Sequence, residues 1–431
     1  MKKWLLASAG LFCAIAVIIA SASSFRHSRV ETKDIEEEII PVRLNDTLSN
    51  GMSDIPELLG MDRSVEKFLK RWEIRGASLA IMRNDSLVYA KGFGWADAED
   101  SVRMEPGNIL RMASVSKLIT AAGIMKLKEA GLLSLQDTVF GACGILNDTT
   151  FTKAIRDRRI FRITVEQLLR HKGGFTTGHG DPMFSSQDMI RQFHLDGAPD
   201  SRTLVQCELT RWLGFAPGTS QQYSNFGFLL LSLVIEKLSG QPYEDYIQEN
   251  ILQPAGCYDM HIARNYYEER YPNEVKYYMQ AGSEPCEEYN LSGRLVERCY
   301  GGSNITGLSG AGAWVGSPAE LCRFVASIDG RPEVPDVISA ESVAEMTEYF
   351  DPQTFSLGWN DTKPDGEWTR TGTLSGTSAL VKCYPDGECW IMITNTGTYR
   401  GPHFSKYVST LFRNCREAYS DSLPRYNLFG S

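Results

Sequence analysis

The chain has 431 residues, of which 42% are hydrophobic, and a formal net charge of -9 at pH 7. This length and apolar content are enough for one large core or for two lobes that share an interface. Nucleic acid binding rewards positive charge, and this acidic chain has no basic run, so nucleic acid is excluded as a partner.

The first 22 residues have the three parts of an export signal. Two lysines form a positive start, an apolar run extends from Trp4 to Ala20, and small residues at positions 20–22 offer a cleavage site. The apolar run is also just long enough to span a bilayer, so an uncleaved anchor is the alternative to cleavage. We therefore expect an exported protein, periplasmic or anchored facing the periplasm, with no other contact to a membrane.

Residues 23–58 are polar and acidic, which predicts a flexible tether. An amphipathic helix is expected next, near Ser64–Trp72. Two short strands should follow at Ala77–Arg83 and Ser86–Trp95, because the pair Asn84-Asp85 between them is typical of a hairpin turn.

The middle of the chain has mostly helical patterns. The pattern at Ser114–Ala130 stops at Gly131, where a left-handed cap would fit. Residues 140–260 indicate helical segments broken by loops, most clearly at Phe226–Ser239. Residues 265–305 are irregular and rich in Tyr and Glu, which indicates an insertion.

Strand-like segments return late in the chain, and a closing helix is expected near Phe404–Arg416. The strands are expected at Gly312–Val315, Trp368–Gly372, Ser378–Tyr384 and Cys389–Asn395. Strands at both ends with helices between them predict an α+β (or α/β) fold. Its antiparallel sheet is built from both termini, flanked by helices, and carries an inserted helical lobe. The expected divisions are a signal peptide (1–22), a tether (23–58), a main domain (59–420) with a helical lobe at about 140–300 and the insertion, and a tail (421–431).

The motif Ser-Val-Ser-Lys at 114–117 is the first candidate for chemistry. On a helix, positions i and i+3 lie on one face, so the Lys117 amine can reach the Ser114 oxygen. A serine needs a base to become a nucleophile, and a partly buried lysine near another cation can lose its charge and act as that base. The same spacing at 64–67 is interpreted as a helix cap and a solvated face.

The motif Tyr-Ser-Asn at 223–225 is the second candidate. In extended backbone, residues i and i+2 point the same way, so Tyr223 and Asn225 can face one cleft. A tyrosine beside cations can relay protons, and an amide can bind both a substrate carbonyl and a lysine. Taken alone, Tyr223 would more often be a packing residue at a helix start.

The third candidate is Arg-Thr-Gly at 370–372, on a late strand. A cation at Arg370 would hold a substrate carboxylate and favour anionic intermediates. Gly372 has no side chain, so a substrate backbone could lie against the strand edge beside Thr371. Taken alone, an exposed arginine on a strand is usually only a solvated charge.

The three motifs in this order resemble the set of the serine β-lactamase-like and penicillin-binding-protein superfamily. The Tyr-x-Asn motif is similar to the class C β-lactamase branch with its esterase and D-amino-peptidase relatives. Further similarity to the family lies in ITVEQLLRHKGGF, FAPGTSQQYSNFGFLLLSLVIEKLSGQPYEDYI and SGAGAWVGSPAELCRFV. The resemblance covers roughly residues 60 to 415 and is weakest at 265–305.

This resemblance implies a β-lactamase/transpeptidase-like fold and an acyl-enzyme reaction on an amide or ester carbonyl, without a cofactor. The implied catalytic residues are Ser114, Lys117 and Tyr223. The implied substrate-binding residues are Asn225, Arg370, Thr371 and Gly372. The implied oxyanion donors are the backbone N–H groups of Ser114 and Thr373.

Two segments depart from the family pattern. Arg370 stands where relatives usually have Lys or His, and arginine cannot give up its proton, so it can orient a carboxylate but not relay protons. Residues 172–174 are Lys-Gly-Gly where Ser-Gly is common. The substrate therefore stays open among β-lactams, D-Ala-terminated peptides, small esters and D-amino-acid amides. We expect a small molecule or peptide with a carboxylate.

The same residues leave functions other than hydrolysis to consider. His171, His179 and Asp181 match no metal motif, so no metal is predicted. A non-hydrolytic β-lactam or peptidoglycan sensor or binding protein is the alternative function. Acyl transfer to an alcohol or amine needs only an acceptor that outcompetes water.

Overall fold

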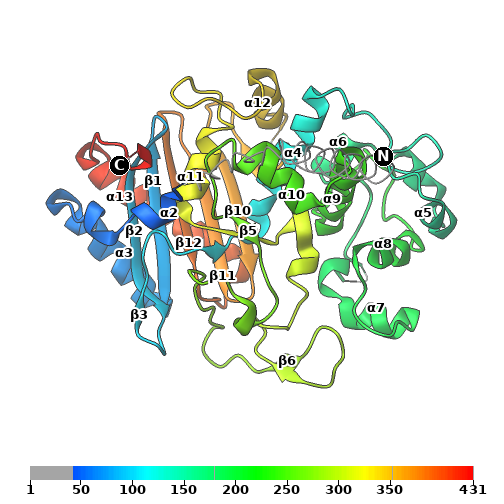
Figure 1. Cartoon of the computed structure of the whole chain (residues 1–431), viewed down its shortest axis with the longest axis horizontal. Coiled ribbons are helices and arrows are strands. Elements are labelled where there is room, and N and C mark those ends of the chain that lie inside the picture. The colour runs from blue at the N-terminus through cyan, green and yellow to red at the C-terminus, as the bar shows by residue number, and fades with distance from the viewer. Residues whose placement is uncertain (1–41, 179, 352, 431) are drawn as a thin grey trace, which may run out of the picture. The chain divides into compact units, whose positions relative to one another are not determined.

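Strands from both ends of the chain form one antiparallel sheet, as predicted, in the order β3-β2-β1-β12-β11-β10-β9 (Figure 1). The computed structural model describes residues 42–178, 180–351 and 353–430, so the predicted signal peptide at 1–22 lies outside the described residues. The strands of this sheet are β1 (Gly76–Arg83), β2 (Ser86–Asp97), β3 (Val102–Arg103), β9 (Asp361–Thr362), β10 (Trp368–Leu374), β11 (Thr377–Cys383) and β12 (Glu388–Thr394).

Antiparallel pairs of consecutive strands and one long-range pairing hold this sheet together. The predicted turn between β1 and β2 is confirmed, and Asn84 and Asp85 both have positive φ angles, 45° and 55°, as a two-residue hairpin turn requires. Strand β12 pairs with β1 from Ala77↔Thr394 to Arg83↔Glu388, which joins the two ends of the chain.

The central strands are buried on both faces, which explains their nearly continuous apolar sequence. In β1, Leu79 and Ile81 pack into one core while Ala80 and Met82 pack into the other, because successive side chains point to opposite faces. Helices α3 (Leu59–Arg71) and α13 (Ser405–Tyr419) cover the first face. Figure 1 shows both beside β1 and β2, away from the helical region.

The helical region lies on the other side of the sheet and contains the larger core (Figure 1). Helix α4 (Ser116–Glu129) packs against α9 (Asn225–Ser239), and both are buried around most of their circumference. Gly131 and Gly240 follow them with φ angles of 71° and 72°, which confirms the left-handed cap predicted at Gly131. The other helices here are α5 (Thr149–Ala154), α6 (Val165–Leu169), α7 (Ser186–Phe193), α8 (Ser201–Leu209) and α10 (Tyr243–Ile247).

Smaller elements complete the fold. Strands β4 (Leu110–Arg111), β8 (Trp314–Gly316) and β5 (His261–Ile262) form a second antiparallel sheet, and β6 (Cys286–Glu287) pairs with β7 (Leu295–Val296). The remaining helices are α2 (Leu44–Thr47), α11 (Pro318–Ala326) and α12 (Ala340–Thr347). Among the described residues, no helix combines the length and apolar character that a membrane crossing requires.

The expected insertion at 265–305 is fixed to the main sheet by backbone hydrogen bonds. The Tyr278 N–H donates to the Asn395 carbonyl over 2.9 Å, and the Gly397 N–H donates to the Tyr278 carbonyl over 2.8 Å. The Tyr277 hydroxyl also accepts from the N–H of Arg111, over 2.7 Å, just ahead of the predicted nucleophile. The insertion is therefore hydrogen-bonded both to the main sheet and to β4, the strand that precedes Ser114.

The flexible tether predicted for 23–58 is wrong from Val42 onward. Leu44 and Asn45 of helix α2 are buried, and the Asn45 amide donates to Asp259 over 2.8 Å. The Asn45 side-chain oxygen accepts from the Ser317 hydroxyl over 2.6 Å. The polar composition of this segment suggested disorder, but its polar side chains have partners far along the chain.

We predict that Asn45→Ala lowers the free energy of unfolding by about 1–3 kcal/mol, because it removes one hydrogen bond from each of the buried side chains of Asp259 and Ser317. Equilibrium urea denaturation measures the change. The matched control is Asp46→Ala, since the Asp46 side chain is 54% exposed and forms a surface ion pair with Arg43. It should cost less than about 1 kcal/mol. Equal small effects of both variants would contradict the anchoring role of Asn45.

Candidate active site

Ser114 lies in a tight 3-10 turn, Ala113–Val115, that leads directly into α4. Strand β10 presses against this turn at Gly372, where a Cβ atom would lie 2.2 Å from the Met112 carbonyl oxygen and 3.1 Å from the Ser114 nitrogen. The absent side chain of Gly372 therefore makes room for the nucleophile's own loop. A substrate backbone was expected in that space, but the turn that carries Ser114 occupies it.

Lys117 lies beneath the serine and is fully buried. Its Nζ is 3.2 Å from the Ser114 Oγ and 2.7 Å from the Asn225 Oδ1, and it also donates to the Ala311 carbonyl. Burial disfavours the charged amine, and the nearby Arg370 adds to this effect, although Tyr223 and Asp181 oppose it. The result is a pKa of Lys117 lowered to about 8, so the neutral base is accessible near physiological pH.

Tyr223 contacts the serine from the other side. Its hydroxyl donates to the Ser114 Oγ over 2.7 Å and accepts from the Arg370 Nη2 over 3.2 Å. Burial by itself would raise the pKa of this phenol, but the charges of Lys117 and Arg370 outweigh it and lower the pKa of Tyr223 to about 8. One oxygen is thus held between two groups that can each exchange a proton near neutral pH.

Arg370 reaches the site as predicted, but it is fully buried and does not line the cavity at Ser114. Its Nε donates to the Ser114 carbonyl over 2.8 Å, and its Nη2 contacts Tyr223. Its Nη1 has no hydrogen-bond partner among the described residues. The guanidinium therefore acts on the nucleophile's backbone and on the tyrosine.

Asp181, which the sequence pattern raised only as a possible metal ligand, orients Asn225. The Asn225 Nδ2 donates to the Asp181 Oδ2 over 2.7 Å, which leaves its Oδ1 to accept from Lys117. Asp181 lies in a loop without any periodic pattern, so no local signal connects it to Asn225. Among the described residues, no group of His, Cys, Asp or Glu side chains is arranged to hold a metal ion.

His171 supports the tyrosine from the side. Its ring lies 4.5 Å from the Tyr223 ring, and its Nδ1 accepts from the Ser224 N–H over 3.1 Å. Burial, followed by the charges of Lys117 and Arg370, lowers the pKa of His171 well below its usual value, so the ring is neutral. His179, weighed with it as a metal ligand, lies outside the described residues.

A cavity of about 370 Å³ opens at Ser114. Its lining residues are Ser114, Phe184, Tyr223, Asn225, Leu308, Ala311, Gly312, Asn360, Thr371, Thr373, Leu374 and Pro402. Strand β9 pairs with β10 only at Trp368 and Thr369. Beyond them, the Asn360 side chain, which the sequence analysis missed, accepts from the backbone N–H of Thr371 over 2.7 Å.

The structure thus brings the predicted site residues together around one serine. Ser114, Tyr223, Asn225, Thr371 and Thr373 line the cavity, while Lys117, Arg370 and Gly372 lie against the nucleophile's turn. The predicted proximity is confirmed. The separate roles, including the two oxyanion donors, stay predictions.

Several curated proteins are similar to this chain, and two of those that follow have names that include the words penicillin-binding protein. PbpX of Bacillus subtilis (strain 168), named as a penicillin-binding protein, is 25% identical over 335 residues, which are 77% of this chain and 73% of PbpX. Penicillin-binding protein 4* of the same organism is 26% identical over 59% of this chain. Protein flp of Staphylococcus aureus (strain MW2) is 27% identical over 54% of this chain. The chain spans 52% and 44% of the lengths of these last two proteins.

Solved structures share the fold. The octameric penicillin-binding protein homologue from Pyrococcus abyssi has a TM-score of 0.60 and 22% identity, covering 83% of this chain and 78% of that one. The D-amino acid amidase from Ochrobactrum anthropi SV3, complexed with L-phenylalanine amide, has a TM-score of 0.65 and 20% identity, covering 85% of this chain and 99% of the amidase.

The sequence profile described as Beta-lactamase matches residues 61–407, a range that contains every residue gathered around Ser114. The narrower expectation of a class C relationship stays a prediction. With the profile covering most of the chain, and with penicillin-binding-protein homologues among its relatives, the chain belongs to the β-lactamase family.

Proposed function

We propose that this chain is an exported serine hydrolase that cleaves an amide or ester carbonyl through an acyl-enzyme on Ser114. One observation carries the proposal: the Ser114 Oγ lies 3.2 Å from the Lys117 amine and 2.7 Å from the Tyr223 hydroxyl, and both groups have a pKa of about 8. The family membership supports the same reaction type.

The reaction begins when the Ser114 oxygen attacks the carbonyl carbon and its proton passes to the Lys117–Tyr223 pair. General base assistance of this kind contributes about 10²–10⁴ in rate. The negative charge that develops on the carbonyl oxygen is stabilised by the backbone N–H groups of Ser114 and Thr373, and each such donor contributes about 10²–10³. Tyr223 then protonates the leaving group, and water opens the acyl-enzyme.

Arg370 and Asn225 hold the pair in place during these steps. Arg370 donates to the Ser114 carbonyl and to the Tyr223 oxygen, so it fixes the turn and favours the phenolate. Asn225 accepts from the Lys117 amine and is itself held by Asp181. Export is part of the proposal because residues 1–22 have the composition of a signal peptide.

Ser114→Ala should abolish covalent labelling by a serine-directed fluorophosphonate and stop turnover of p-nitrophenyl acetate. Ser64→Ala is the matched control, because Ser64 has the same spacing to a lysine but its hydroxyl donates to the Gly60 carbonyl of its own helix. Intact-mass measurement reads the labelling, and undiminished labelling of Ser114→Ala would remove Ser114 from its role. Stable acylation by penicillin without any turnover would favour the sensor instead.

Activity should rise with pH through an apparent pKa near 8. The active form needs the Lys117–Tyr223 pair to have lost one proton, and the two groups titrate as a pair rather than separately. Below that pKa, kcat/KM should therefore fall about tenfold for each pH unit. p-Nitrophenyl acetate suits the measurement because it does not titrate. A flat profile across the neutral range would contradict the assignment of this pair as the base.

A further inference from the structure

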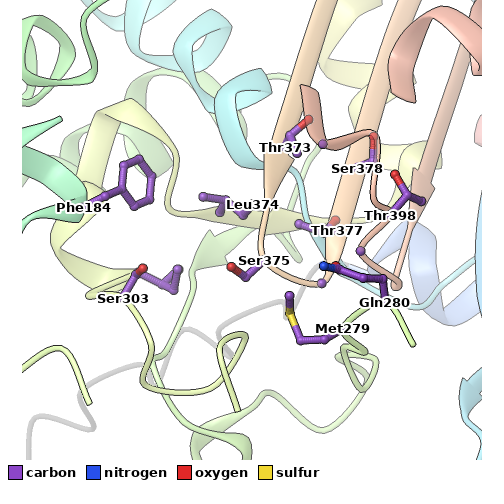
Figure 2. A pocket seen from close by; sticks show the side chains of 14 residues that line it. Phe184, Met279, Gln280, Ser303, Thr373, Leu374, Ser375, Thr377, Ser378 and Thr398 are labelled. Carbon is purple, nitrogen blue, oxygen red and sulfur yellow. The ribbon is translucent and has the colours of Figure 1, made fainter. Parts of the chain in front are cut away.

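A second cavity of about 290 Å³ adjoins the cavity at Ser114 (Figure 2). The two cavities share Phe184, Thr373 and Leu374 in their linings, so they lie side by side. Figure 2 shows Leu374 and Ser375 in the middle of this space, with the Phe184 and Ser303 side chains on one side and Gln280 and Thr398 on the other.

The predicted insertion forms one wall of the second cavity, through Met279, Gln280, Ser303 and Ile305. This wall is held close to the hairpin between β10 and β11. Gly376 in that hairpin has a φ of 83°, and a Cβ atom there would lie 2.8 Å from the Tyr277 Cβ and 3.0 Å from the Cys299 Cβ. Together with the backbone bonds of Tyr278, this contact makes the wall a fixed part of the cleft.

Neither cavity has a charged side chain among its lining residues. The polar groups of the second cavity are hydroxyls and one amide. Several of them have no side-chain hydrogen bond within the described part of the chain, namely Gln280, Ser303, Ser375, Ser378 and Thr398. These groups can donate to and accept from a neutral ligand.

The charges near the nucleophile are unavailable to a ligand. Lys117 and Arg370 are fully buried and outside the lining of both cavities. The Asp181 carboxylate is bonded to Asn225, and its negative charge would repel a second carboxylate. A carboxylate held within these two cavities would lose water without gaining a cationic partner from their linings, which is unfavourable.

We propose that the substrate is an uncharged ester or amide whose amide- or hydroxyl-bearing chain extends from Ser114 into the second cavity. In this arrangement Arg370 is a positioning residue for Ser114 and Tyr223, and it does not bind a substrate carboxylate. The inference rests on the proposed hydrolysis at Ser114 and adds the class of substrate, which differs from the carboxylated ligand expected from the sequence.

Matched pairs of esters that differ only in charge test this selectivity. On the acyl side the pair is p-nitrophenyl glutaramate, which ends in an amide, and mono-p-nitrophenyl glutarate, which ends in a carboxylate. On the alcohol side the pair is para-acetoxybenzamide and para-acetoxybenzoate. For at least one pair, kcat/KM should favour the neutral ester by about tenfold or more, after correction for alkaline hydrolysis rates.

Gln280→Lys should reduce or reverse this preference, because it places a cation in the second cavity. Each value is divided by that for p-nitrophenyl acetate, an ester without an ionisable group. Gln253→Lys is the matched control, because Gln253 is exposed and lines neither cavity, and it should leave the preference unaltered. A wild-type preference for the carboxylates, or no response to Gln280→Lys, would overturn the proposal. Protection of Ser114 from the fluorophosphonate reports the same preference without turnover, so failure of hydrolysis is distinguished from failure of selectivity.

Substitution of Arg370 separates positioning from substrate binding. Arg370→Met should lower kcat/KM equally for both members of a pair and shift the pH profile to higher pH, because loss of a neighbouring cation raises the pKa of both Lys117 and Tyr223. Arg370→Lys keeps the positive charge and should restore much of the original pH profile. The other groups that face the pair, Asp181 and the neutral His171, are the same in both variants, so a shift of the profile reports the charge at position 370. A loss confined to the carboxylated ester, with an unmoved profile, would show that Arg370 binds the carboxylate.

Discussion

The burial of the Lys117 amine against Ser114 is the interaction on which the rest of the site depends. An ammonium in this position loses hydration, and its donors are taken by Ser114, Asn225 and the Ala311 carbonyl. Those partners come from the nucleophile's own turn, the start of α9 and the segment before β8. Because three separate parts of the chain must meet at one nitrogen, the packing of α4 against α9 and the position of the base are a single constraint.

Arg370 extends that constraint to the sheet. Its bond to the Ser114 carbonyl ties β10 to the turn, and the absent side chain at Gly372 allows the two backbones to approach. Lys117 and Arg370 thus lie close together on either side of the serine's turn, and the positive charge of each makes the charged state of the other less favourable. The same burial that lowers the pKa of Lys117 removes both cations from the cleft surface, so reactivity and preference for a neutral ligand have one physical origin.

The sequence predicts the parts of this site that obey a local spacing. Ser114 and Lys117 are one helical turn apart, and Tyr223 and Asn225 alternate along extended backbone, so each pair can be recognised without a structure. Asp181, Asn360 and the Ala311 carbonyl cannot be found in this way, since they lie in loops and contribute through contacts distant in sequence. For the same reason, the composition of 42–58 suggested a tether although its side chains have buried partners.

The direction of Arg370 shows a further limit of sequence patterns. Strand alternation predicts that Arg370 and Gly372 share one face of β10, but it does not say whether that face meets substrate or the protein's own backbone. In the structure that face of β10 meets the backbone of residues 112–114, so substitutions at Arg370 or Gly372 would disturb the turn that carries Ser114. The wall formed by the insertion tolerates substitution more easily. Gln280 and Ser303 line the cavity there, and their side chains make no hydrogen bond in the described part of the chain. Selectivity in this protein can therefore vary through the insertion while the chemistry at Ser114 stays fixed.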